Sequence, residues 1–329
     1  MKIIISGLHE NINIMFSLNK FLNICPNYYH IKFNVNTTEK YITMDGKKYE
    51  TISNDEMKKI NEKTIVLVQC YYRTRIINNK NLKYITLQYF IPSIISNYNP
   101  QNWLYKNTIS LINFTKKNNF YTGIPIGSIQ VDNLLYKKNL PKYDIVYFPN
   151  YPTKSHSDIE LSNLKLLKET SIINKILKKY QNKYSIVTLP HPGIFICNRG
   201  RNSNEYINPK FNFNNEEYIK NAKVIINSCK SFISLSMCLN KTIIHIKDSL
   251  LPNLLPNMDE YVKKGNYYIP NLTEENFELC LKCALAGIKE EEKNYYYNKH
   301  IKEFYDVNEK SPTEKLIDII NYEYENFDN

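Results

Sequence analysis

No stretch of the sequence approaches the roughly 20 consecutive apolar residues that a helix needs to cross a bilayer, and the longest apolar runs are the length of a strand. Residues 1–7 form a short apolar run that leads into a turn, without the charged region, long apolar region and cleavage site of a signal peptide. We therefore expect a soluble protein without a signal peptide, located in the cytoplasm.

The sequence also lacks the cysteine pattern of a disulfide framework, because its seven cysteines are an odd number and are widely spaced. This pattern favours a reducing compartment. The one C-x-x-C pair, Cys280 and Cys283, lies in a helical pattern with no second pair or histidine cluster to complete a zinc site. No D-x-D pair of carboxylates follows a predicted strand. We therefore expect no metal site and no tightly bound cofactor.

The turn after the first predicted strand lacks the glycines of a dinucleotide-binding loop. It reads Ser6-Gly7-Leu8-His9-Glu10 and has one glycine where dehydrogenases carry G-x-G-x-x-G, which disfavours a dehydrogenase. His9 or Glu10 could accept the proton of a hydroxyl group at the mouth of a cleft. The alternative is that both are solvated residues at the start of a helix, where the helix dipole favours Glu10.

Positive charge predominates, since 43 Lys and Arg against 32 Asp and Glu give a formal net charge of +11. Such a charge favours anionic partners, including nucleotide diphosphates and phosphorylated glycans. The lysines are scattered, and no compact basic block with interleaved aromatic residues indicates a nucleic-acid interface. We expect no nucleic-acid partner, while peripheral attachment to a membrane and the oligomeric state stay open.

The length of 329 residues exceeds the usual limit for one hydrophobic core and favours two domains. Short apolar runs alternate with amphipathic stretches of helical length, as in parallel βαβ units. The predicted strands are 2–6, 64–70, 83–88, 143–148, 184–189, 223–227 and 242–247, and the predicted helices include 12–22, 100–115, 159–180 and 231–238. We place the first domain at 1–138 and the second at 139–293, with C-terminal helices at about 294–329 packing across the junction onto the first domain.

Ligands of open α/β sheets bind beyond the carboxyl ends of the strands, and polar residues follow three predicted strands of the second domain. The candidate residues are His191 and Gly193 after the first of these strands, Asn227, Ser228, Lys230 and Ser231 after the second, and Asp248 after the third. A histidine between two prolines is suited to donate to a phosphate. The free N–H groups of a helix that begins near Ser231 could hold a pyrophosphate, although capping of that helix explains the serines equally well.

Several segments together resemble a known family. The run from Gly123 to Leu134 is similar to "G-x-P-x-x-D-x-L", and the run from Ala222 through Lys241 to Asp248 resembles "A-D-x-x-I-T-D-S-S-x-x-x-x-E-A-x-x-L-x-K-P-x-I-x-x-x-D". Both elements are found in proteins of the GT-B type related to CDP-glycerol glycerophosphotransferases and UDP-GlcNAc 2-epimerases. The resemblance implies two Rossmann-like domains with an interdomain cleft, and a nucleotide diphosphate held by the second domain.

The sequence departs from the family pattern in ways that bear on activity. The family acid that contacts the ribose falls in Ser234-Leu235-Ser236, where only Ser234 or Ser236 could substitute for it. The acids that epimerases carry after the strands at 66–70 and 84–88 are also absent. This absence disfavours epimerisation, which needs acid and base groups at those places.

We therefore expect a metal-independent glycosyltransferase that moves a sugar from a UDP- or CDP-linked donor to an acceptor hydroxyl during glycan biosynthesis. Glu10 or His9 would accept the proton, and Arg73 or Arg199 could hold phosphates from a loop. One alternative is a UDP-GlcNAc 2-epimerase-like or polyol-phosphate transferase enzyme. The other is an inactive GT-B scaffold that binds a glycan or a protein.

Overall fold

The computed structural model describes residues 1–6, 18–35, 37–44, 46–70, 77–88, 108–112, 115–116, 123–136, 142–149, 159–190, 206–210, 215–227, 232–247 and 254–328. These residues form two compact units. The first unit contains the described residues up to 136 and those from 302 onward, and the second contains those from 142 to 301. The boundary expected at residues 138 and 139 falls outside the described residues.

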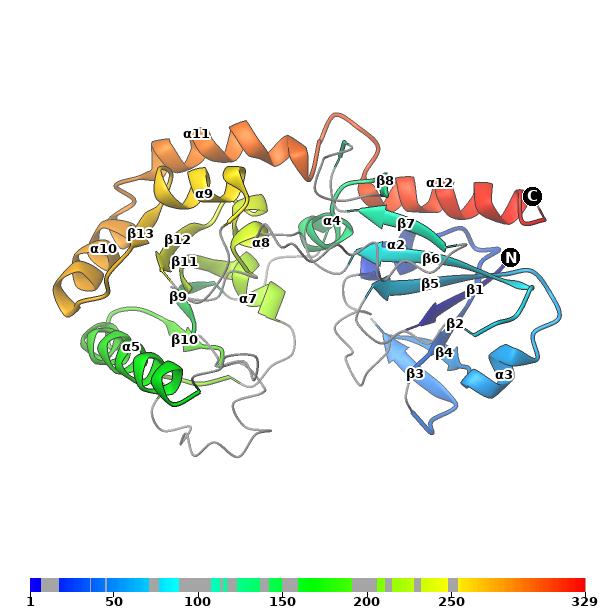
Figure 1. Ribbon diagram of the computed structural model, residues 1–329, viewed down its shortest axis with the longest axis horizontal. Helices are drawn as coiled ribbons and strands as arrows, with labels where there is room; N and C mark the ends of the chain where they lie inside the picture. The colour runs from blue at the N-terminus through cyan, green and yellow to red at the C-terminus, as the bar shows by residue number, and fades with distance from the viewer. Residues whose placement is uncertain are drawn as a thin grey trace. The chain divides into compact units, whose positions relative to one another are not determined.

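The first unit is built on an eight-stranded sheet (Figure 1). Its strands are β1 (Lys2–Ser6), β2 (His30–Asn34), β3 (Tyr41–Met44), β4 (Lys47–Thr51), β5 (Thr64–Cys70), β6 (Leu82–Gln88), β7 (Thr108–Ile112) and β8 (Ile124–Pro125). They lie in the order β3-β4-β2-β1-β5-β6-β7-β8, and only the β3–β4 pair is antiparallel. The helices of this unit are α2 (Asn19–Ile24), α3 (Asn54–Lys58), α4 (Ile129–Tyr136) and α12 (Pro312–Glu325).

Alternate residues of the central strands feed two cores in the first unit, as the period of two along a strand requires. Ile3 and Ile5 of β1 belong to the larger core with α2, α4 and α12, whereas Ile4 faces the smaller core with Met57 of α3. The sheet is therefore covered by helices on both faces, which explains why β1 and β5 carry consecutive apolar residues at 3–5 and 65–68.

The second unit is a five-stranded, fully parallel sheet with the order β10-β9-β11-β12-β13. Its strands are β9 (Tyr143–Phe148), β10 (Ile186–Thr188), β11 (Ala222–Asn227), β12 (Thr242–Ile246) and β13 (Tyr267–Ile269). Its helices are α5 (Ile159–Tyr180), α7 (Asn215–Asn221), α8 (Ile233–Cys238), α9 (Pro256–Lys263), α10 (Glu274–Ala286) and α11 (Glu290–His300), followed by the 3-10 turn η4 (Ile301–Glu303). Residues of α5 and α10 share one core with the sheet, and α8 contacts α7 and α9.

The alternation of strands and helices predicted from the sequence is confirmed, but one predicted helix is wrong. The stretch expected to be helical at 100–115 contains strand β7, because Thr-Ile-Ser-Leu-Ile is rich in β-branched residues and can pair with β6. The hairpin of β3 and β4 turns at Gly46, whose φ of 77° is the left-handed conformation that glycine accommodates. Of the last two helices, α11 belongs to the second unit and α12 to the first.

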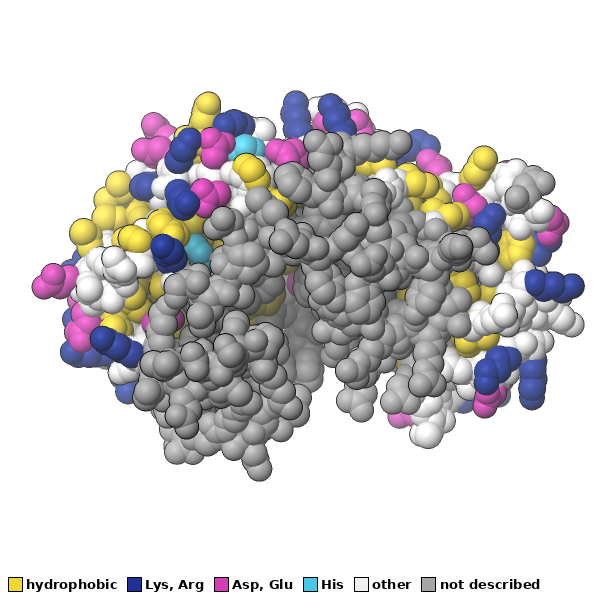
Figure 2. Space-filling view, in the orientation of Figure 1, with side chains coloured by type: hydrophobic (Ala, Val, Ile, Leu, Met, Phe, Trp, Pro, Cys, Tyr) yellow, Lys and Arg dark blue, Asp and Glu magenta, His cyan; other side chains and the backbone are white. Residues whose placement is uncertain are grey.

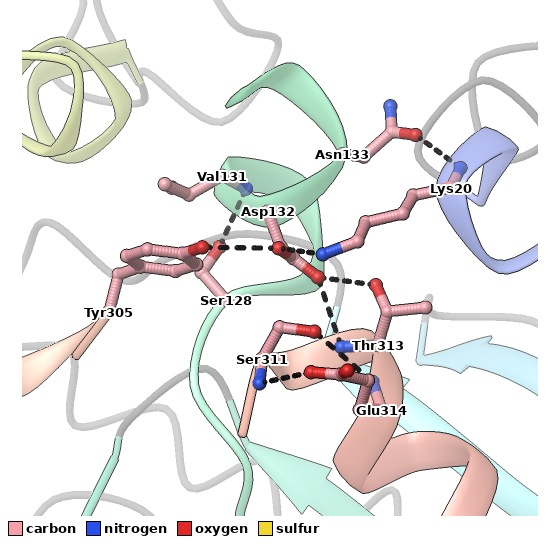
Figure 3. Close-up of polar contacts among 9 residues, drawn as sticks. All are labelled: Lys20, Ser128, Val131, Asp132, Asn133, Tyr305, Ser311, Thr313 and Glu314. Carbon is pink, nitrogen blue, oxygen red and sulfur yellow. Dashed lines mark hydrogen bonds and ion pairs between the residues drawn. The ribbon is translucent and has the colours of Figure 1, made fainter. Parts of the chain in front are cut away.

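The buried carboxylate of Asp132 holds the C-terminal helix α12 in the first unit (Figure 3). Asp132 of α4 is 1% exposed. One of its oxygens accepts hydrogen bonds from the N–H (3.1 Å) and hydroxyl (2.5 Å) of Thr313, in the first turn of α12. The other carboxylate oxygen of Asp132 pairs with Lys20 Nζ of α2 at 2.7 Å and accepts a hydrogen bond from the Tyr305 hydroxyl at 3.3 Å. A negative charge at this end of α12 is also favoured by the helix dipole.

The backbone at Phe304 and the side chain of Pro312 lie very close to Gly127, just before α4. Ser128 N–H donates to the Phe304 carbonyl at 2.8 Å. A Cβ atom at Gly127 would lie 2.9 Å from the Phe304 oxygen and 3.0 Å from Pro312, and the φ of Gly127 is 85°. Glycine is therefore required here both for its backbone conformation and for the returning segment at Phe304. The run from Gly123 to Leu134 thus contains the residues that dock the C-terminal segment.

Replacing Asp132 by Asn should destabilise the first unit by about 3 kcal/mol, because it leaves Lys20 without its buried counter-charge. Urea unfolding followed by circular dichroism measures the change. The matched control is Asp318→Asn. Asp318 lies on α12 and forms an exposed pair with Lys310, which precedes that helix. This variant should cost less than about 1 kcal/mol. Equal losses in the two variants would contradict the anchoring role of Asp132.

Gly127→Ala should destabilise the protein more than Gly46→Ala. Both glycines have positive φ, but nothing lies within 4 Å of a Cβ atom at Gly46. Backbone strain of about 1 kcal/mol applies to both variants, and only Gly127→Ala adds a clash with Phe304 and Pro312. The difference between the two urea midpoints isolates the clash, and indistinguishable midpoints would show that residues 302–312 do not pack against Gly127.

Candidate functional site

The carboxyl ends of the parallel strands of the second unit lie at one edge of its sheet. These ends are Phe148 of β9, Thr188 of β10, Asn227 of β11 and Ile246 of β12. The order β10-β9-β11-β12-β13 is the doubly wound order in which the chain reverses its direction of travel between the first and third strands. The reversal therefore falls between β9 and β11, and a crevice beyond the strand ends is expected there.

The candidate donor-binding residues follow the strands that end at this edge. His191 comes three residues after Thr188, Ser228 directly follows Asn227, and Asp248 comes two residues after Ile246. Strands β10 and β11 both flank β9, so their ends lie roughly 10 Å apart, twice the spacing of neighbouring strands. Of the donor-binding candidates, Asn227 is described; His191, Gly193, Ser228, Lys230, Ser231 and Asp248 lie outside the described residues.

Asn227 is fully buried at the end of β11, beside the reversal point. Its carbonyl oxygen lies 3.0 Å from Nδ1 of His245 on β12, and since a carbonyl only accepts, Nδ1 carries the proton. The ring of His245 is 2% exposed and stacks on Tyr268 with a centroid distance of 6.0 Å. These contacts hold the end of β11 rigidly. His245 was missed in the sequence because an interior strand position carries no local signal.

The start of α8 packs against the end of β9. The rings of Phe148 and Phe232 lie 4.6 Å apart, which holds the first residues of α8 close to the reversal point. The helix begins at Ile233, two residues later than predicted. Ser234 and Ser236 are 1% and 0% exposed, and the Ser236 hydroxyl donates to the Phe232 carbonyl at 2.7 Å. The Ser236 hydroxyl thus donates within its own helix, and the expectation that Ser234 or Ser236 takes the place of the family acid stays a prediction.

In the first unit, the candidate acceptor-side residues follow two neighbouring strands. Gly7, His9 and Glu10 come after Ser6 of β1, and Arg73 comes after Cys70 of β5, which pairs with β1. These candidates, together with Arg199, lie outside the described residues. The strands that precede them end side by side, because β1 and β5 are parallel and in register from Lys2 to Ser6.

Polar contacts that were not predicted from the sequence fix the end of β1. The Ser6 hydroxyl donates to Oδ1 of Asn34 at 2.9 Å, and the Asn34 amide donates to the Ile52 carbonyl and to Asn54. The position of the chain at Ser6 is thus fixed by these contacts. Asn34 could be found only once β2 was known to lie next to β1.

The described residues contain no group of three or more His, Cys, Asp or Glu that could hold a metal ion. Among the described helices, none is both long and apolar enough to cross a membrane. On the face drawn in Figure 2, Lys side chains are interspersed with Asp and Glu over the described surface. Lys263 with Asp259 and Lys264 with Glu260 are examples of ion pairs between partly or largely exposed side chains on α9 and directly after it.

Comparison with solved structures finds similar folds at low sequence identity. A variant of the wall teichoic acid polymerase TagF matches with a TM-score of 0.66 and 12% identity, over 99% of this chain and 89% of that chain. The UDP-GlcNAc 2-epimerase of Methanocaldococcus jannaschii, in complex with UDP-GlcNAc and UDP, matches with a TM-score of 0.51 and 13% identity, over 98% and 100% of the two chains.

A Listeria monocytogenes protein assigned as a UDP-N-acetylglucosamine 2-epimerase matches with a TM-score of 0.56 and 9% identity, over 99% of this chain and 97% of that chain. No protein-family model and no curated protein matches the sequence. The resemblance read from the motifs is thus confirmed for the fold: the chain has the two-domain α/β fold of the GT-B type.

Proposed function

We propose that the protein is a glycosyltransferase that moves a sugar from a UDP- or CDP-linked donor to an acceptor hydroxyl. The observation that carries this proposal is the strand order of the second unit, which places the reversal point between β9 and β11. The strands that precede His191, Ser228 and Asp248 in the sequence, β10, β11 and β12, all end at the same edge. The similar structures support it further, since one of them contains UDP-GlcNAc and UDP.

In this proposal the second unit binds the diphosphate of the donor. The imidazole of His191 and the ammonium of Lys230 donate hydrogen bonds to the phosphate oxygens, and Asp248 accepts from hydroxyl groups of the ribose or sugar. Ser228 and Ser231 contribute hydroxyl donors, and Gly193 lets the backbone approach the ligand. Negative charge grows on the departing diphosphate as the glycosidic bond breaks, so these donors stabilise the transition state more than the bound donor.

The first unit would present the acceptor. Glu10 or His9, after β1, takes the proton of the acceptor hydroxyl as its oxygen attacks the anomeric carbon. Arg73 or Arg199 can hold a phosphate with two parallel hydrogen bonds. Because neither the base nor the phosphate donors require a metal, the reaction is proposed to be metal-independent, and the excess of positive charge suits an anionic donor.

A polyol-phosphate transferase is the second candidate. The TM-score is 0.66 for the teichoic acid polymerase, against 0.56 and 0.51 for the two epimerases. The same edge of the second unit would then bind the diphosphate of a CDP-linked polyol, and the bond that breaks would be a phosphoanhydride rather than a glycosidic bond. The two candidates are distinguished by which bond of the donor is broken, the glycosidic bond of a nucleotide sugar or the phosphoanhydride of a CDP-linked polyol.

A thermal-shift screen against UDP, CDP, GDP and their sugar and glycerol conjugates should show stabilisation by at least one of them. A ligand at 100 times its Kd adds about 2.7 kcal/mol when it binds only the folded state. Turnover of the stabilising donor with and without acceptors is then followed by mass spectrometry. Binding without turnover would favour an inactive scaffold, and conversion of UDP-GlcNAc alone would favour an epimerase.

His191→Ala should weaken the binding of the stabilising nucleotide by about tenfold, because a hydrogen bond to a charged phosphate contributes about 1.5 kcal/mol or more. Isothermal titration calorimetry measures the change in Kd. His30→Ala is the control, since His30 is exposed at the opposite end of the strands in the first unit. Unchanged affinity in the His191 variant would remove this residue from the donor site.

A further inference from the structure

Residues 228–231, the segment proposed to hold the diphosphate, lie outside the described residues, but the residues on both sides of them are held in place. Asn227, before the segment, is fully buried at the end of β11, and its carbonyl oxygen is bound by His245. Phe232, after the segment, packs its ring against Phe148 at the end of β9, with the centroids 4.6 Å apart. The contact at Asn227 is the one made by a polar side chain.

His245 lies beside Asn227 on the neighbouring strand. Strands β11 and β12 are parallel and pair Asn227 with His245, and β12 in turn pairs His245 with Tyr268 of β13. Ile244 and Ile246 face the core that the sheet shares with α5 and α10. Because side chains alternate along a strand, the imidazole of His245 lies on the opposite face. Helix α8, which follows the diphosphate segment in the chain, contacts β12.

The hydrogen bond from His245 is directional. Its Nδ1 lies 3.0 Å from the Asn227 carbonyl oxygen, and its buried ring stacks on Tyr268 with an interplanar angle of 25°. The Asn227 carbonyl belongs to the peptide group that joins Asn227 to Ser228, and a peptide group is planar. The bond therefore fixes the plane of the peptide group that leads into the diphosphate segment. The same peptide group carries the N–H of Ser228.

Packing by itself does not require a histidine at this position. Strand β12 reads Thr-Ile-Ile-His-Ile, and its last four residues are buried. A buried polar ring loses its hydration and needs hydrogen bonds in return, whereas another isoleucine would fill an interior position without that cost. What the imidazole adds is a donor aimed at the Asn227 carbonyl, at the edge of the sheet where the nucleotide diphosphate is proposed to bind.

We propose that His245 is a positioning residue for the diphosphate of the donor and acts through its hydrogen bond to the Asn227 carbonyl. This proposal rests on the proposed function, because it assigns the same edge of the sheet to the nucleotide. His245 does not touch the ligand. It orders the peptide group between Asn227 and Ser228 in advance, so that less conformational freedom is lost when phosphate oxygens bind.

The test is titration of the full chain and two variants with UDP, CDP and GDP by isothermal titration calorimetry. His245→Phe keeps a ring that can stack on Tyr268 but cannot donate to the carbonyl. His245→Asn loses the ring but places an amide N–H at about the position of Nδ1. The Phe variant should bind the nucleoside diphosphate about tenfold more weakly, the effect of roughly one lost hydrogen bond. The Asn variant should stay within about threefold of the unmodified protein.

Two further measurements separate positioning from general destabilisation. Asn266, 1% exposed just before β13, accepts from the Ile243 N–H at 2.8 Å and donates to the Tyr261 carbonyl at 3.1 Å. Asn266→Ala should lower the urea midpoint, because it removes buried hydrogen bonds at the amino edge, and should leave nucleotide affinity unchanged. The loss in His245→Phe should also be smaller for the matching nucleoside monophosphate, which has one phosphate fewer to place.

The outcomes distinguish this proposal from the proposed function. If the unmodified protein binds none of the three nucleoside diphosphates, both are wrong. If it binds one of them and His245→Phe binds equally well, or if the Phe and Asn variants or Asn266→Ala lose affinity equally, only the positioning role is overturned. His245→Gln, whose amide matches the position of Nε2, should behave like the Phe variant and replaces it if circular dichroism shows that the latter is unfolded.

Discussion

The first unit depends on one buried charge, the carboxylate of Asp132. It draws together three elements far apart in the chain: α4, which carries it, α2 through Lys20, and α12 through Thr313. Such a charge is tolerated in the interior because Lys20 compensates it and hydrogen bonds satisfy its oxygens. Gly127 complements this anchor by letting residues 304 and 312 approach the backbone. The run from Gly123 to Leu134, which resembles a family motif, therefore binds the C-terminal segment of the chain in this unit.

In the second unit, the two edges of one parallel sheet carry different polar groups. At the carboxyl edge, the strand order puts a reversal point next to the buried Asn227, which is held by His245. At the amino edge, the ammonium group of Lys241 donates to the carbonyl of Ala222 at the start of β11. Parallel strands produce this separation, since every strand begins at one edge and ends at the other. We propose the carboxyl edge as the place of the nucleotide diphosphate.

Sequence reasoning did best where the pattern was long and local. Helix α5 was predicted over its full length from Ile159 to Tyr180, and β11 differed from prediction by one residue. It failed at β7, where a stretch that could be read as amphipathic pairs with β6 as a strand. It also missed β2, whose polar ends hide a strand buried mainly at Phe33. In both cases the deciding contacts come from strands remote in sequence, which local propensity does not contain.

The sequence by itself determined the α/β class, the expectation of two domains and the order of the short motifs, because these follow from composition, length and hydrophobic period. Only the tertiary structure decided that Asp132 binds a helix almost two hundred residues away, that Ser236 bonds to its own helix, and that His245 bonds to the Asn227 carbonyl. The physical reason is that burial and charge pairing depend on which elements become neighbours. In a sheet, that choice is made by strand order, which residues close together in sequence do not specify.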